Sequence, residues 1–481
     1  MKRHCTHSEL WLLAACAALA AGEALGFALS RFCALCPVAA ALAVFSALFG
    51  YALSVRFWPH VAVFLAGLAL SLASAEARAD FFRRADILSA GRPFETEVVV
   101  TGGATARTSA DGAEWVSFGG VAGPVRLRVV GRREAGAPLP VRGERWECAG
   151  WLSRDGQGRG RPRILWAKGA GTYARRAPPS GRDRLARLAL RVRRSLSRRL
   201  GLGLADGAES AALCRAILLG ERAALDGGLK DEFAAAGTVH VFAISGLHVM
   251  VVAEVMLVAL SLLCVPRRAA GIALVPMLWA YVFVVGAPPS AVRAALMATF
   301  YFAGPLFWRR GDTLSAWALA FLAVHAADPS MLADVGCRLS FAVMLALAAW
   351  SRLCDGIGGA AGASAVAWAA GAPLAAQAFG RLTAGSLAAN LALLPLAAVC
   401  VGAGALGCMA SVVSDSLAAH FNNAAALAAR FMAELSRMVA SVPGASVSVE
   451  RWSWADCALW YAALALAVAT LWAVRRFFKR L

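Results

Sequence analysis

Charged side chains are scarce in this chain. Only 16% of its 481 residues are Asp, Glu, Lys or Arg, and 60% are hydrophobic. Soluble proteins are usually about 25% charged and 45–50% apolar. The mean hydropathy of +0.63 points the same way. This composition excludes a disordered protein, a fibrous protein and an ordinary cytosolic enzyme, and it predicts a polytopic α-helical membrane protein.

Acidic residues are especially few in one segment, residues 77–200. This segment holds 26 of the 48 Lys and Arg residues but only 11 of the 29 Asp and Glu residues, which gives it +15 of the net charge of +19. A basic segment facing water implies an anionic partner, such as nucleic acid, phospholipid headgroups or an acidic polymer. GC-rich codon usage accounts equally well for the preference for arginine over lysine.

Spacings typical of metal ligands are also missing. Of the twelve cysteines, only Cys33 and Cys36 form a CxxC pair, and no second pair accompanies it. A disulfide on the oxidising side of a membrane is the alternative for this pair. The seven histidines form no ligand motif. We therefore expect neither a metal site nor a cofactor.

Long apolar runs account for most of the chain. Three of them open it, at about 10–29, 38–55 and 61–75. Eight more follow, at about 239–265, 269–287, 291–308, 314–327, 339–350, 361–380, 386–408 and 455–474. Basic residues at both ends predict cytoplasmic termini, with residues 77–200 on the outer side. Because eight crossings from outside would end outside, one run is not a full crossing, which leaves about 10–11 membrane segments.

Residues 92–175 have a different pattern. Short runs rich in Val and Trp, separated by glycines, predict five strands at 96–101, 115–121, 125–130, 145–152 and 162–168. In the third of these, Val125, Leu127 and Val129 alternate with Arg126 and Arg128, as in a half-buried strand with a basic outer face. Together with nearby tryptophans this predicts a small β-barrel resembling an oligonucleotide-binding fold. A generic β-domain with a tryptophan core is the alternative.

Residues 182–200 predict a basic amphipathic helix. Leucine and valine recur at helical spacing, and arginines cover its other faces. Such a helix is typical of a segment lying on anionic headgroups, and contact with DNA phosphates is the alternative. Short helices are expected at 211–219 and 229–236. The more polar stretch 411–442 predicts a pair of interfacial helices.

These patterns divide the chain into six parts. They are an N-terminal three-span membrane region (1–76), a β-rich oligonucleotide-binding-like domain (77–180), basic interfacial helices (181–237), a membrane channel core (238–410), interfacial helices (411–454), and a last span with a basic cytoplasmic tail (455–481).

Several motifs carry a resemblance to a known family. The sequences at 218–222 (LLGER) and 236–249 (AGTVHVFAISGLHV) closely resemble the signature of ComEC-type competence proteins, the inner-membrane DNA-uptake channels of transformable bacteria. The blocks at 286–297 and 328–341, and the later residues Gln377, Asn390 and Pro395, resemble further motifs of that family. Arg338 departs from it, because the family commonly has Gln there. The resemblance covers about 210–410.

The resemblance and the residue chemistry together predict a polar path through the membrane. Ser245-Gly246 interrupts an apolar run, and irregular backbone at membrane depth survives only inside protein or beside a wet cavity. Ser290 is the expected N-cap of the helix at about 291–308, which places Arg293 in the first turn of that helix. An anion, or an ion pair with Asp334 or Glu254, would stabilise the Arg293 side chain there. The predicted path residues are His240, Ser245, Gly246, His248, Glu254, Ser290, Arg293, Asp334, Arg338, Ser340, Gln377 and Asn390. The predicted DNA-binding residues are Arg126, Arg128, Arg187, Arg191 and Arg194.

The resemblance implies a channel for single-stranded DNA across the bacterial inner membrane during natural transformation. The sequence has neither the His-x-His-x-Asp-His motif of the metallo-β-lactamase-like nuclease domain that many members carry nor a Walker A motif. We therefore expect no enzymatic activity, and separate proteins as DNA receptor, nuclease and cytoplasmic motor. Membrane lipids are further partners, and homo-oligomerisation stays open. The alternatives are a transporter of another anionic or amphipathic substrate and a membrane scaffold with a DNA- or lipid-binding outer domain.

Overall fold

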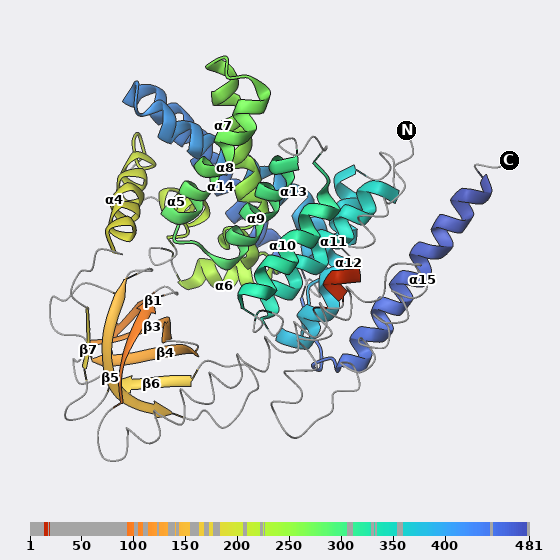
Figure 1. Cartoon of the computed structure of the whole chain (residues 1–481), viewed down its shortest axis with the longest axis horizontal. Coiled ribbons are helices and arrows are strands. Elements are labelled where there is room, and N and C mark those ends of the chain that lie inside the picture. The colour runs from red at the N-terminus through yellow and green to blue at the C-terminus, as the bar shows by residue number, and fades with distance from the viewer. Residues whose placement is uncertain are drawn as a thin grey trace.

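The computed structural model describes a β-sheet and a larger helical body (Figure 1). The described residues are 14–17, 19, 94–100, 104–108, 114–122, 125–132, 140, 144–153, 163–167, 173–176, 183–204, 209–221, 225, 227–304, 311–328, 331, 334–353, 359–442 and 446–478. The runs predicted at 38–55 and 61–75, most of the first run, and the Cys33–Cys36 pair lie outside them.

The sheet contains the five predicted strands and two more. Its strands are β1 (Phe94–Val100), β2 (Thr105–Thr108), β3 (Glu114–Ala122), β4 (Val125–Arg132), β5 (Arg145–Ser153), β6 (Arg163–Ala167) and β7 (Tyr173–Arg176). The prediction missed β2 and β7, which have four residues each. Strands this short do not repeat an alternating pattern often enough to be detected.

Five of these strands pair in a closed path. β1 pairs with β3, β3 with β4, β4 with β6, β6 with β5, and β5 pairs back to β1. The β4–β6 pairing is parallel and the other four are antiparallel. The additional strands β2 and β7 pair with β3 and β5. Since each of the five has two neighbours, none of them leaves a fully open edge.

The alternation predicted for β4 is confirmed. Val125, Leu127 and Val129 are buried, with 5% or less of each exposed, whereas Arg128 is exposed. The Arg128 Nε donates a hydrogen bond to Ser117 Oγ at 2.9 Å. The side chain of Arg126 is outside the described part of the chain.

The aromatic residues of this domain divide into two groups. Phe118 and Trp146 are buried and pack with ring centroids 5.5 Å apart, so they are core residues. Trp151 is 40% exposed. Burial also raises the pKa of the Cys148 thiol to about 12, so this cysteine behaves as a small hydrophobic residue.

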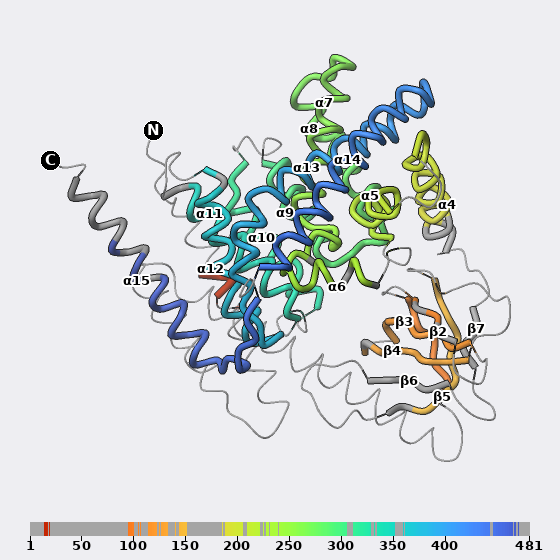
Figure 2. Tube along the Cα trace, turned by 180° about the vertical axis from the view of Figure 1, so that it is seen from behind, coloured from red at the N-terminus to blue at the C-terminus, as the bar shows by residue number. Residues whose placement is uncertain are grey.

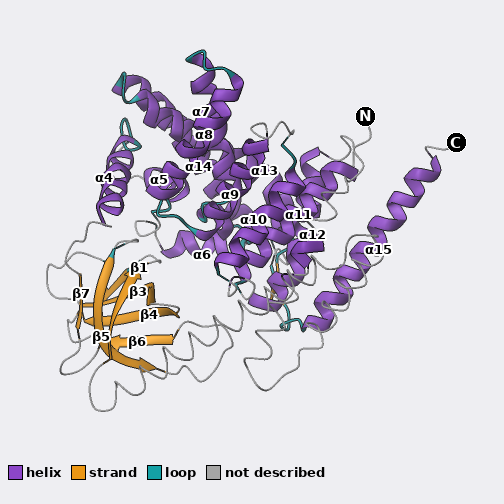
Figure 3. Ribbon diagram, viewed as in Figure 1, coloured by secondary structure: helices purple, strands orange, loops and turns teal. Residues whose placement is uncertain are grey.

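Helices make up the larger body (Figure 3). Its first helices are α4 (Asp183–Arg199), α5 (Glu209–Leu219), α6 (Gly227–Ala235) and the 3₁₀ helix η2 (Val239–Phe242). They are followed by α7 (Gly246–Leu262), α8 (Arg267–Val284), α9 (Pro289–Ala303), α10 (Thr313–Ala327), α11 (Val335–Leu353), α12 (Gly359–Phe379), α13 (Gly385–Ala410), α14 (Asp415–Ser441) and α15 (Trp454–Phe478). The short strands β8 (Arg381–Leu382) and β9 (Val447–Ser448) pair between the last helices.

Two of the described helices, α8 and α13, are long and apolar enough to cross a membrane. Helices α7 and α10 and residues 335–351 of α11 are apolar but shorter. The eight predicted runs correspond to α7–α13 and α15. The larger number of crossings stays a prediction.

The helix pair predicted at 411–442 is wrong, because this stretch forms the single helix α14 along α13 (Figure 2). Neither Gly nor Pro interrupts residues 415–441, so nothing ends the helix. One of the polar residues of this stretch serves packing. Asn422 is buried, and its Nδ2 donates to the carbonyls of Arg199 and Leu202, 2.8 and 3.0 Å away. Gly407 of α13 leaves the room for Asn422, because a Cβ there would overlap its Oδ1.

The main core lies between α5, α7, α8, α9, α13 and α14. A second cluster joins α10 and α11 to the N-terminal segment. There the Cys16 thiol donates to the Ala318 carbonyl at 3.4 Å. Cys16 is therefore packed inside the helical body.

Candidate functional site

The helical structure is interrupted at the predicted position, directly before α7. This interruption is called the break below. η2 ends at Phe242, Ser245 is extended with φ −104° and ψ 178°, and α7 starts at Gly246. The Ser245 N–H donates to His248 Nδ1 at 3.2 Å, and the Ser245 Oγ lies 3.0 Å from the same nitrogen. The Ser245 side chain also accepts from the backbone N–H of His248, so the two residues form a capping box for α7. Gly246 does not make the break, but it faces Ala294 of α9, where a Cβ would meet only an ordinary contact.

His248 has one unused nitrogen. Because Nδ1 accepts the Ser245 N–H, the ring proton is on Nε2 in the neutral imidazole. Only 1% of His248 is exposed, and Nε2 has no hydrogen-bond partner among the residues that the structure describes. A buried N–H donor without a partner is rare and costly, so it marks a place where a water or ligand oxygen fits.

Two more path residues lie beside this break. The side chains of His240 on η2 and Asn390 on α13 lie near each other. Asn390 Oδ1 has no partner within the described segments. His240 is exposed at the surface of the helical body.

The N-cap predicted at Ser290 is wrong. Helix α9 starts at Pro289, with Pro288 as its cap. Proline suits the first helical position because its φ is preset and the missing N–H has no partner there. Ser290 Oγ instead donates to the carbonyl of Ile244, which ties α9 to the break. Arg293 consequently is the fifth residue of α9, in its second turn, rather than the third residue as predicted.

Arg293 reaches the start of α11. Asp334 caps that helix through Oδ1, which accepts from the Cys337 N–H at 2.7 Å. A terminal nitrogen of Arg293 donates to the Gly336 carbonyl at 3.0 Å, and the Asp334 carboxylate attracts the guanidinium. Only 4% of Arg293 is exposed, and its Nε has no partner in the described part of the chain. Glu254, the other predicted ion-pair partner, is exposed on α7.

Arg338 joins three helices at the same place. It donates to Gln377 Oε1 of α12 at 3.1 Å, and its guanidinium lies 5.0 Å from the ring centroid of Trp454, the first residue of α15. Asp334 attracts this guanidinium too. The Arg338 Nε also lacks a partner among the described residues. Ser340 lies half-buried two residues further along α11.

The structure thus brings most predicted path residues into two neighbouring groups. The break group contains His240, Ser245, His248, Ser290 and Asn390, and the arginine group contains Arg293, Asp334, Arg338 and Gln377. Helix α9 connects them, because Ser290 and Arg293 lie one turn apart.

Residues 217–474, a little over half of the chain, match the family described as "Competence protein". The chain belongs to this family. It is 30% identical over 217 residues to ComE operon protein 3 of Bacillus subtilis (strain 168), covering 44% of this chain and 28% of that protein. It is 38% identical over 172 residues to Competence protein ComA of Neisseria gonorrhoeae, covering 32% of this chain and 23% of that protein. These matches span only about a quarter of each relative's length. No solved structure matches the chain.

Both polar groups lie within the part that matches the Competence protein family. Sequence reasoning missed Trp454, whose only signal is an aromatic residue at the start of the last apolar run. It also missed Glu221 of the LLGER motif, which accepts from Ser197 Oγ at 2.8 Å and lies 3.3 Å from Arg193 Nε. Glu221 therefore holds α4 rather than lining the path.

An open groove of about 550 Å³ lies at the start of α15. Arg451, Trp452, Leu459 and Trp460 line it together with the carboxylates of Glu450 and Asp456. Two carboxylates on the wall disfavour a polyanion.

The predicted DNA-binding arginines lie on two elements. Arg128 on β4 and Arg191 and Arg194 on α4 are exposed. The side chains of Arg126 and Arg187 are outside the described residues.

Proposed function

We propose that this chain forms the membrane passage through which single-stranded DNA enters a bacterial cell during natural transformation. Its membership of the Competence protein family supports a role in DNA uptake. Because the matched relatives are about four times longer than the regions they share with this chain, the passage itself is our proposal rather than a property carried over.

The observation that carries the proposal is the set of unused donors inside the helical body. Arg293 Nε, Arg338 Nε and His248 Nε2 are buried without partners in the described structure. Ionisable side chains within a membrane protein are expensive and usually functional. A phosphodiester supplies the negative charge and acceptor oxygens that these three donors lack.

We propose that the incoming DNA strand first contacts the β-domain. Five of its strands close in the order β1-β3-β4-β6-β5, with β4 and β6 as the parallel pair, and this closed five-stranded arrangement supports our proposal of an oligonucleotide-binding-like fold. Exposed Arg128 and Trp151 offer the cationic and stacking contacts that single strands use. We place this domain outside the inner membrane, and the chain as a multi-pass protein in it.

The chain itself is neither nuclease nor motor in this proposal. We assign degradation of the second strand, the driving force and the receptor that delivers DNA to separate proteins.

The test is the transformation frequency of a strain lacking this gene. We expect near-complete loss, restored by the wild-type gene, with unchanged binding of double-stranded DNA to the cell surface. A transporter of another anionic substrate would leave transformation intact. In detergent, the full chain should bind a labelled single strand with an affinity that falls steeply with salt. A scaffold without DNA contact would not bind.

A further inference from the structure

Helix α4 presents a second face that the DNA passage does not use. Its inward side packs on the helical body through Ala189 and Leu200, of which 8% and 1% are exposed, and through the partly buried Leu196. The helix stands beside α8 and α14, at the edge of the body (Figures 1 and 2). The remaining exposed surface of α4, called its outward half below, has no partner within the described structure.

Polar contacts fix the rotation of α4 about its own axis. Glu221 holds Ser197 and Arg193 from one side. At the end of the helix Arg199 donates to Ser411 Oγ at 2.6 Å, and Asn422 donates to the carbonyl of Arg199. Because these contacts orient the helix, the composition of its outward half is a fixed property of the surface.

The outward half consists of two adjoining arcs. At 100° per residue, Arg191, Arg194 and Arg198 form a cationic arc, and all three are exposed. Leu185, Leu188 and Val192 form an apolar arc beside it, with 67%, 54% and 38% of each residue exposed. Aliphatic side chains at helical spacing in contact with water are unfavourable without a covering partner.

We infer that this outward half of α4 docks on an anionic phospholipid surface. DNA phosphates would neutralise the arginines but leave the three aliphatic side chains in water. An anionic bilayer satisfies both arcs, because the aliphatic side chains enter the headgroup–acyl boundary while the arginines stay at the level of the lipid phosphates. This assigns Arg191 and Arg194 to lipid rather than to DNA.

The docked helix lies between the β-domain and the membrane body in the chain. Lipid binding on its outward half and Glu221 on its inward half therefore hold the segment that connects the two. The inference does not depend on DNA passage, since it concerns which surface covers α4.

The experiment uses the full chain in lipid nanodiscs. An environment-sensitive fluorescent amino acid replaces Leu188, which leaves every cysteine unchanged, and the bilayer carries a spin-labelled lipid as quencher. The same fluorophore at Glu97, exposed on β1, is the control position. We expect quenching at position 188 and none at 97, and stronger quenching with phosphatidylglycerol than with phosphatidylcholine alone.

Charge variants sharpen the result. Arg191→Gln with Arg194→Gln should weaken docking on the anionic bilayer roughly thirtyfold, because each basic residue near such a surface contributes about one factor of five. Arg128→Gln with Arg132→Gln, exposed on β4, should leave quenching unchanged. Absence of quenching at position 188 in both lipids overturns the inference. So does a signal that responds to a single-stranded oligonucleotide and not to the lipid, which would make α4 a nucleic-acid contact.

Discussion

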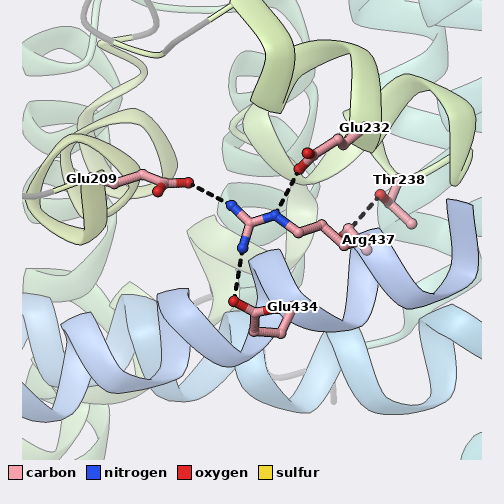
Figure 4. A network of polar contacts seen from close by, with 6 residues as sticks. Glu209, Glu232, Thr238, Glu434 and Arg437 are labelled. Atoms are coloured by element: carbon pink, nitrogen blue, oxygen red, sulfur yellow. Dashed lines mark hydrogen bonds and ion pairs between the residues drawn. The ribbon is translucent and has the colours of Figure 1, made fainter.

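Two arginines of the helical body have opposite surroundings. Arg437 on α14 is 37% exposed and is surrounded by three carboxylates (Figure 4). Its Nε donates to Glu232, and its terminal nitrogens donate to Glu434 and Glu209, at 3.0, 2.7 and 3.1 Å. Arg293 on α9 is only 4% exposed and donates a hydrogen bond of 3.0 Å to the backbone carbonyl of Gly336.

The contrast separates a structural arginine from a functional candidate. Arg437 uses all three nitrogens to join α5, α6 and α14, so its chemistry is complete without a ligand. Arg293 leaves Nε unused where burial makes that costly. An interior cation with spare donors is what an anionic substrate requires, whereas a surface cation with three carboxylates repels one.

The largest effect is expected for Arg293→Ala. It should lower transformation frequency roughly a hundredfold, because two hydrogen bonds to a charged group are worth about 3 kcal/mol. Arg293→Lys should lose less, since lysine keeps the charge but not the planar fork. The measurement is transformation frequency together with the amount of protein in the membrane.

Arg293→Ala has a clear opposing outcome. If Arg293 serves only to hold the start of α11, the variant loses protein from the membrane and its uptake falls in proportion. Normal abundance with normal uptake would contradict both roles.

A smaller effect is expected for substitutions of His248. Two variants can separate its role as a cap of α7 from its role as a hydrogen-bond donor through Nε2. His248→Ala removes half of the capping box and should destabilise the protein by about 1 kcal/mol. His248→Gln keeps a side chain suited to that position of the box, but it does not place a ring N–H at Nε2. We expect the Gln variant to melt like the wild type and to take up DNA roughly tenfold less, about the effect of one hydrogen bond. Wild-type uptake by this variant would reduce His248 to a cap.

The smallest effect is expected for Arg437→Met. Exposed ion pairs contribute only about 0–1 kcal/mol each, and salt screens them. The methionine should therefore change thermal stability little and transformation not at all. A loss of uptake comparable with that of Arg293→Ala, at normal protein abundance, would erase the distinction between the two arginines.

The sequence predicted the features that depend on local pattern. The alternation of Val125, Leu127 and Val129 located β4 and its buried face, and Ser245-Gly246 located the break before α7. Both signals lie within a few consecutive residues. The motifs of the resemblance also predicted that Arg293, Asp334, Arg338 and Gln377 belong to one polar path, although 84 residues of sequence separate Arg293 from Gln377.

Features that depend on tertiary contact were missed. Asn422 reads as a polar interruption of an apolar stretch, but it caps the end of α4 from another helix. Ser290 looks like a cap until Ile244, far away in sequence, provides its acceptor. The ring of Trp454 contacts the Arg338 guanidinium only because α15 packs beside α11. In each case the deciding partner lies on a different element, where periodicity gives no information.

The most direct test of the central claim is to find DNA at the break itself. A photo-crosslinking amino acid at Ala243, half-buried between η2 and α7, is compared with the same residue at Met250, exposed on α7. Cells taking up labelled DNA are irradiated, and the DNA attached to the chain is measured. The account predicts crosslinks at position 243 and none at 250, with single-stranded DNA as the product. DNA uptake without crosslinks at position 243, or with equal crosslinks at both positions, would contradict it.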